Sequence, residues 1–105
     1  MTEIIRYSDK GDCRKHRELL ADLVNRLEEK NYDLIVTNMT YSVGDLEGEI
    51  DVLATRGEWN HFYEIKSGHH RIAKAKRQYA RFKEAFPDIK VKGIYHDNDC
   101  YRLMR

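Results

Sequence analysis

Two acidic stretches, Gly48-Glu49-Ile50-Asp51-Val52-Leu53 and Phe62-Tyr63-Glu64-Ile65-Lys66, decide the fold of this chain. Each stretch alternates polar and apolar residues with a period of two, which is typical of a β-strand. The Arg56-Gly57-Glu58 stretch between them favours a turn. The two strands are therefore expected to form a hairpin at the centre of the fold.

Strict alternation predicts which side chains of these strands share a face. The first strand divides into two sets, with Glu49, Asp51 and Leu53 on one face and Ile50, Val52 and Ala54 on the other. On the second strand, one face carries Phe62, Glu64 and Lys66. We therefore expect Asp51, Glu64 and Lys66 to lie on a common side of the hairpin.

Helical periodicity flanks the hairpin on both sides. Residues 12–30 carry an apolar face formed by Leu19, Leu20, Leu23, Val24 and Leu27. Residues 70–86 carry a second apolar stripe, and Pro87 ends that helix. Short strands are expected at residues 3–7, 32–39, 91–96 and 101–104, and a turn around Gly44 at residues 41–47. The predicted order is strand, helix, three strands, helix, two strands, in one α/β domain spanning residues 1–105.

Composition and charge limit the classes of function. The chain has 105 residues, 41% of them hydrophobic, and no apolar stretch long enough to span a bilayer. Its N-terminus lacks a secretory signal, so a cytoplasmic location is expected. Cys13 and Cys100 have no CxxC spacing, so neither a structural zinc nor an iron-sulfur site is indicated. The net charge of +1 conceals an uneven distribution of charge along the chain, because residues 65–83 hold seven lysines and arginines and no acid.

The acidic strands have the chemistry of a metal-dependent hydrolase. Mg2+ takes oxygen ligands and needs only one or two protein carboxylates, which Asp51 and Glu64 supply together with the backbone carbonyl of Ile65. Lys66 is placed to orient a water or to stabilise negative charge on a phosphate. Glu49 is a candidate for a further water or metal ligand, with a solvated strand end as the equal alternative. Solvated faces with ordinary cross-strand Glu–Lys pairs are the alternative for both strands.

The second helix has a basic side suited to a polyanion. Its row comprises Lys74, Arg77, Gln78 and Arg81, with His69, His70 and Arg71 near the N-terminal end. Such a row contacts successive DNA phosphates, whereas the alternative is a solvated helical face. No motif for reading the major groove is present, so we expect recognition of phosphate geometry and DNA shape rather than of base sequence.

These residues resemble the PD-(D/E)XK nuclease superfamily, and within it the archaeal Holliday junction resolvases and their small relatives. The likeness rests on Gly48–Asp51, on the Glu64-Ile65-Lys66 triplet and on the basic helix that follows. It implies a restriction-endonuclease-like fold with a mixed β-sheet flanked by helices, Asp51 and Glu64 as metal ligands, and Lys66 as the catalytic lysine. Gln78 followed by Phe82 is similar to the Q-x-x-x-Y feature of RecB-type nucleases, in which case Gln78 orients the lysine or a phosphate.

The resolvases usually have a further glutamate of the site on the first helix, and this chain departs from that family pattern. At 100° per residue, Glu18 falls opposite the apolar stripe of that helix. His16 and Asp12 fall on the correct side and are the candidates to complete the site. Glu18 remains a candidate if the helix begins or kinks differently.

Together these observations predict a Mg2+-dependent endodeoxyribonuclease, with Mn2+ as a possible metal, that acts as a homodimer on branched DNA in recombination or repair. No small-molecule organic cofactor and no membrane are expected. The alternatives are a repair or defence nuclease on linear, flap or single-stranded DNA, a non-catalytic DNA-binding module of the same fold, and a scaffold subunit that binds an acidic protein.

Overall fold

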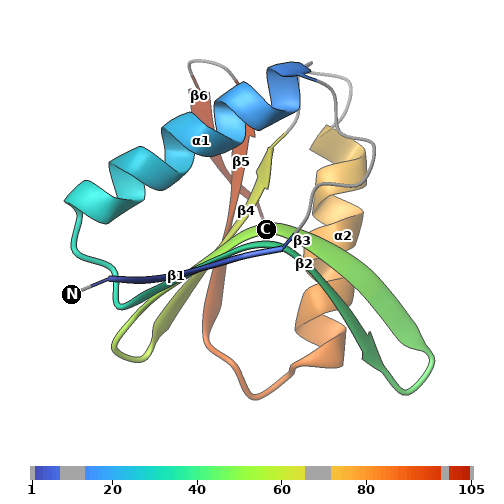
Figure 1. Ribbon diagram of the computed structural model, residues 1–105. Helices are drawn as coiled ribbons and strands as arrows, with labels where there is room; N and C mark the ends of the chain where they lie inside the picture. Colours follow the sequence, from blue (N-terminus) through green and yellow to red (C-terminus); the bar gives the residue numbers. More distant parts are fainter. Residues whose placement is uncertain (1, 8–13, 66–71, 98–99, 105) are drawn as a thin grey trace.

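Six strands form one mixed sheet in which the spatial order follows the chain order, as the computed structural model shows (Figure 1). The strands are β1 (Glu3–Arg6), β2 (Leu34–Val43), β3 (Leu46–Arg56), β4 (Trp59–Ile65), β5 (Val91–Asp97) and β6 (Cys100–Met104). The β1–β2 and β4–β5 pairs are parallel, and the other three neighbouring pairs are antiparallel. The predicted α/β class and the predicted order of elements are confirmed.

The structure describes residues 2–7, 14–65, 72–97 and 100–104. Several predicted residues lie outside the described residues, namely Asp12, Cys13, Lys66, His69, His70 and Arg71.

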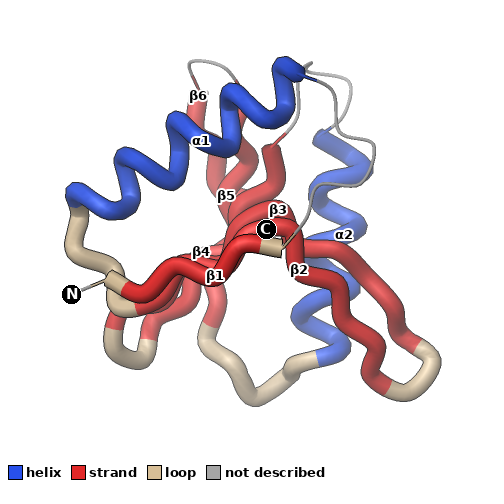
Figure 2. The backbone as a smooth tube through the Cα atoms, viewed as in Figure 1, coloured by secondary structure: helices blue, strands red, loops and turns tan. Residues whose placement is uncertain are grey.

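Two helices cover opposite faces of the sheet (Figures 1 and 2). Helix α1 (Arg14–Glu29) connects β1 to β2, and helix α2 (Ile72–Ala85) connects β4 to β5. Because both faces of β4 are covered, four successive residues, Phe62–Ile65, are buried. In β3, buried and partly buried residues alternate from Ile50 to Thr55. Within the described part of the chain, no helix is both long and apolar enough to cross a membrane.

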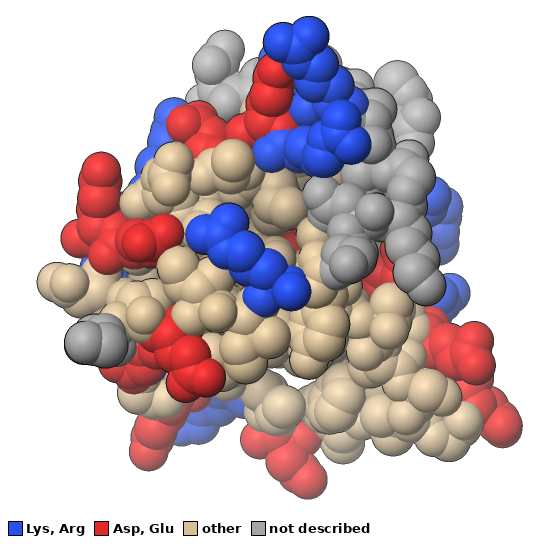
Figure 3. All heavy atoms as spheres, in the orientation of Figure 1, with Lys and Arg blue, Asp and Glu red and all other residues tan. Residues whose placement is uncertain are grey.

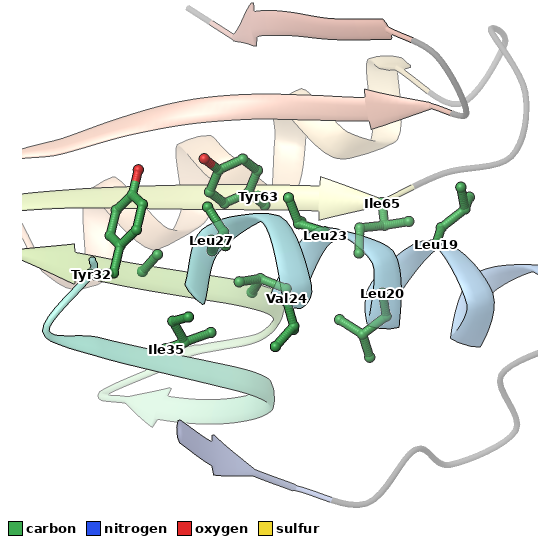
Figure 4. Packing of buried hydrophobic residues seen from close by; sticks show 11 residues of the cluster. Leu19, Leu20, Leu23, Val24, Leu27, Tyr32, Ile35, Tyr63 and Ile65 are labelled. Carbon is green, nitrogen blue, oxygen red and sulfur yellow. The ribbon is translucent and has the colours of Figure 1, made fainter. Parts of the chain in front are cut away.

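The α1 face holds the larger apolar cluster (Figure 4). Its buried members are Leu19, Leu20, Leu23, Val24, Leu27, Tyr32, Ile35, Val52, Ala54, Tyr63 and Ile65. Burying a leucine side chain contributes about 1.5–3 kcal/mol, so this stripe fixes α1 firmly on β2, β3 and β4. His16 lies one helical turn before Leu20, and its position is therefore set by the same contact.

The α2 face holds a second, more aromatic cluster. Its buried members are Ile50, Phe62, Ala75, Tyr79, Phe82, Tyr95 and Met104. The Tyr79 hydroxyl donates to the carbonyl of Val91 at 3.0 Å, and the Tyr79 ring lies directly on Gly93. A Cβ at position 93 would come within 2.7 Å of that ring, so the glycine allows the close approach of α2 to β5. This contact also fixes the neighbouring residue Gln78.

The hairpin between β2 and β3 is longer than predicted. The expected turn at residues 41–47 is wrong, because β2 continues to Val43 and β3 begins at Leu46, leaving only Gly44 and Asp45 in the turn. Gly44 has a φ of 59°, which a two-residue hairpin turn requires. Tyr41 belongs to the strand because its ring packs on α2.

The alternation of faces along β3 is also interrupted. Val52 and Ala54 pack on the α1 face, but Ile50 packs on the α2 face, so the prediction that these three residues share one face is wrong. The cause lies between two cross-strand pairs, Thr37 with Val52 and Met39 with Ile50, where the β2–β3 ladder is interrupted. Asn38 adopts a left-handed φ of 56° at this point, and Asp51 lies opposite it on β3.

Candidate active site

Asp51 lies where β3 separates from β4. The pairing of these strands ends at Val52 and Tyr63. Beyond that pair, the Ile65 backbone N–H donates to Asp51 Oδ2 at 2.8 Å, so a carboxylate oxygen accepts the hydrogen bond that a backbone carbonyl would otherwise accept. Asp51 therefore joins the two diverging strands and lies next to the residue that follows Glu64.

Glu64 is a carboxylic acid side chain in the protein interior. It is 1% exposed and lies on the face of β4 that α2 covers. With the Gln78 amide nitrogen turned toward it, Gln78 donates to both carboxylate oxygens of Glu64, at 2.6 and 3.0 Å. A buried charge is costly unless it is hydrogen-bonded, so Gln78 is part of what holds Glu64 in place.

His16 is a residue of α1 that lies beside the Asp51 carboxylate. Its Nε2 atom lies 3.8 Å from Asp51 Oδ1, and the two side chains are 16% and 17% exposed. Glu18 points elsewhere, because it is exposed and pairs with Arg14 at 3.0 Å. Four predicted residues thus follow one another in a series from α1 to α2. His16 lies beside Asp51, Asp51 accepts from the backbone of Ile65, and Gln78 donates to Glu64, the residue before Ile65.

A groove adjoins this series between the β2–β3 hairpin and α2. It has a volume of about 760 Å³ and is lined by residues 40–42 and 47–49 of the hairpin together with Gln78 and Arg81 of α2. Glu49 is exposed and lines this groove rather than lying in the buried site. Arg81 donates to the Glu47 carbonyl at 3.3 Å, so it links α2 to the hairpin.

The remaining predicted basic residues of α2 face outward. Lys74 and Arg77 are exposed on the helix that carries Gln78. On the face shown in Figure 3, lysine and arginine side chains also gather at the N-terminal end of α1, where Arg14, Lys15 and Arg17 are exposed. Acidic side chains gather instead at the tip of the β2–β3 hairpin. The basic residues at the N-terminal end of α1 adjoin His16, and those of α2 adjoin Gln78.

The donor atoms of the site fit a hard divalent cation. Within residues 14–65 and the other described ranges, no group of three or more His, Cys, Asp or Glu side chains is arranged to hold a metal ion. Mg2+ does not need such a group, because it keeps several waters and binds through one or two carboxylates. A carboxylate has about four lone-pair sites. Asp51 and Glu64 therefore supply oxygen atoms of the kind that Mg2+ prefers as ligands.

Tyr41 is a residue of this region that the sequence reasoning missed. Its hydroxyl lies over Gly48 in the groove, and burial raises its pKa, with the nearby charge of Arg81 acting to lower the pKa and that of Glu64 acting to raise it. Placing residues 41–47 in a turn concealed this contact. The signal that could have revealed it is the glycine at position 48, which leaves room for a large side chain across the hairpin.

In comparisons with known proteins, no family model matches the chain and no curated protein shows significant similarity to it.

Proposed function

We propose that this chain is a metal-dependent endonuclease that hydrolyses phosphodiester bonds in DNA, with a preference for branched DNA. The observation that carries the proposal is a pair of oriented carboxylates near the point where β3 separates from β4. Asp51 accepts from the backbone of Ile65, the residue after Glu64, and Glu64 accepts from Gln78. Carboxylates fixed in this way at the junction of two strands are suited to divalent metal chemistry on phosphate.

Asp51 and Glu64 would hold Mg2+ or Mn2+, with the carbonyl of Ile65 as a further oxygen. When bound, the ion supplies charge neutralisation and a water of lowered pKa. The Ile65 N–H and the Gln78 amide keep the two carboxylates oriented, so little reorganisation is needed when substrate arrives. His16 would hold the Oδ1 side of Asp51. Lys66 would stabilise negative charge on the attacked phosphate.

DNA would bind across the two basic surfaces that flank the site. Lys74 and Arg77 on α2, with His69, His70 and Arg71 before them in the sequence, would contact phosphates on one side. The exposed basic residues at the start of α1 would contact phosphates on the other side. Such contacts read backbone geometry rather than base sequence, which suits a structure-selective enzyme.

A homodimer would suit a branched substrate, because two sites related by a twofold axis make the two nicks that a four-way junction needs. The resemblance to the resolvases supports this part of the proposal. It also supports a cytoplasmic role in recombination or repair.

A cleavage assay on defined DNAs tests the proposed function. Four-way junction, flap, single-stranded and duplex DNA of matched sequence are incubated with the protein, with and without Mg2+. We expect cleavage only with the metal and fastest on the junction. Asp51→Asn should lower the rate at least about 100-fold, because it removes a negative charge while keeping an oxygen to accept from Ile65.

Asp22→Asn is the matched control, because Asp22 is exposed on α1 and pairs with Arg26 at 3.3 Å. Its rate should equal that of the unmodified protein. Equal rates for the Asp51→Asn variant and the control would refute the site. Equal rates on junction and duplex would refute the preference for branched DNA, while DNA binding without any cleavage would favour a non-catalytic module.

A further inference from the structure

The groove between the β2–β3 hairpin and α2 opens beside the proposed site. Gln78 connects them, because it lines the groove and donates to Glu64. The volume of about 760 Å³ is large enough for a nucleotide-sized group. A group bound in the groove would therefore lie next to the phosphate that is hydrolysed at the proposed site.

One donor in this groove is rigidly placed. The Tyr41 ring makes edge contacts with Phe82 and Phe86, with ring centroids 5.9 and 5.4 Å away. Its hydroxyl lies so close to Gly48 that a Cβ there would come within 2.3 Å of the oxygen. A tyrosine hydroxyl is protonated at neutral pH and can donate, and burial raises the pKa of Tyr41 further.

The charges that line the groove disfavour a phosphate inside it. Among the described lining residues, Arg81 is the one cation, whereas Glu47 and Glu49 are both acidic. A nucleobase suits this lining better, because its exocyclic amino groups donate to carboxylates and its ring nitrogens and carbonyls accept from a hydroxyl or a guanidinium. Thr40 and Ser42 also line the groove, and their hydroxyl groups can donate to a base or accept from it.

We propose that this groove receives the base of an unpaired nucleotide next to the phosphate that is cleaved. A base within a duplex is stacked on both faces and paired at its edge, so it must leave the stack to enter a pocket. The inference rests on the proposed function and deepens it, because it names a DNA with an unpaired nucleotide at a branch, flap or bulge as the substrate class. The Tyr41 ring packs in the core cluster, so recognition is by hydrogen bonds to the edge of the base rather than by stacking.

Binding measurements on an inactive variant test the groove separately from cleavage. Asp51→Asn protein is titrated, in Mg2+, into three fluorescently labelled DNAs. The first is a perfect duplex, the second the same duplex with one unpaired nucleotide, and the third carries an abasic sugar at that nucleotide. We expect the second DNA to bind several-fold more tightly than the other two.

Adding Tyr41→Phe to the Asp51→Asn protein should weaken its affinity for the DNA with the unpaired base about 3- to 10-fold. Its affinities for the other two DNAs should stay unchanged, because only the hydroxyl is lost. Tyr101→Phe is the matched control, since Tyr101 lies on β6, is 44% exposed and contacts Arg26 rather than the groove. It should change none of the three affinities.

Two results would overturn the inference. One is equal affinity for the abasic and base-containing DNAs, and the other is an equal loss on all three DNAs from Tyr41→Phe. If the unmodified protein cleaves DNA while either result is found, the groove inference alone fails. If no DNA is bound or cleaved at all, the proposed function fails with it.

Discussion

At the scale of single residues, the most consequential contact is that between Gln78 and Glu64. Glu64 is 1% exposed, and Gln78 donates to both of its oxygens. Replacing Gln78 by leucine keeps the approximate volume but removes the donor, so we expect the free energy of unfolding to fall by about 1–3 kcal/mol. Urea unfolding at neutral pH measures this change.

Arg77→Leu is the matched control on the same helix, because Arg77 is exposed and lies one residue from Gln78. It should change the free energy of unfolding by no more than about 0.5 kcal/mol. Equal stability of the two variants would mean that Gln78 does not hold Glu64.

Asn38 sets the local backbone opposite Asp51. Its φ of 56° belongs to the left-handed region, and its side-chain nitrogen donates to the Tyr7 carbonyl at 3.2 Å. Asn38→Gly and Asn38→Ala both lose that hydrogen bond, but only alanine is strained at this φ. We therefore expect the alanine variant to be less stable than the glycine variant by about 1–2 kcal/mol in urea unfolding.

The same pair of variants tests the link between this backbone conformation and the site. Because Asp51 lies opposite Asn38 where the ladder is interrupted, Asn38→Gly should retain Mg2+-dependent cleavage better than Asn38→Ala. Equal stability of the two variants would show that the left-handed conformation at position 38 is not required.

At the scale of elements, α2 depends on how closely it approaches β5. Gly93→Ala would place a Cβ within 2.7 Å of the Tyr79 ring, and the ring or the helix must then shift. We expect a loss of about 1–3 kcal/mol in the free energy of unfolding. In a Tyr79→Leu background the same substitution should cost less, because the obstructing ring is gone. A double-mutant cycle by urea unfolding measures the coupling, and additive effects would contradict the contact.

The helices were predictable because their apolar stripes repeat at helical spacing and pack on a sheet. The stripe of residues 19–27 is buried as expected, and it places His16 toward Asp51 and Glu18 away from it. The antiparallel pairing of β3 with β4 was predictable because two alternating strands joined by a short turn form a hairpin.

The β2–β3 hairpin was the least predictable element. Gly44 suggested a broad turn, but only two residues turn, because the strands pair in constant register up to Val43 and Leu46. The change of face at Asp51 depends on a left-handed residue in the partner strand, which periodicity within β3 cannot reveal. The groove was missed for the same reason, because it forms only where this longer hairpin reaches α2.

At the scale of the whole molecule, a polar cluster stabilises the end of β4 remote from the candidate site. The Tyr32 hydroxyl and His61 Nδ1 form a hydrogen bond of 2.7 Å, in which the tautomer of the ring decides which group donates. Burial lowers the pKa of His61, and the positive charges of Lys92, Arg56 and Lys30 lower it further. These cations come from β5, from β3 and from the turn that follows α1, so the cluster joins three parts of the chain.

Acidification should therefore destabilise the protein partly through His61. In the unfolded chain this histidine binds a proton near its ordinary pKa of 6.5, whereas in the folded protein its pKa is lower. Between these two pKa values the unfolded state binds more protons than the folded state does, so a fall in pH favours unfolding. The stability that comes from the neutral His61 is therefore present above pH 6.5 and is lost as the pH falls toward the pKa of the folded protein. We expect urea unfolding to show the stability difference between the unmodified protein and His61→Phe shrinking between about pH 7.5 and about pH 5.5. The lost Tyr32 hydrogen bond adds a constant offset to that difference at neutral pH, so only its change with pH reports the titration. A difference that stays constant or grows on acidification would mean that the folded protein keeps His61 as readily protonated as the unfolded chain does.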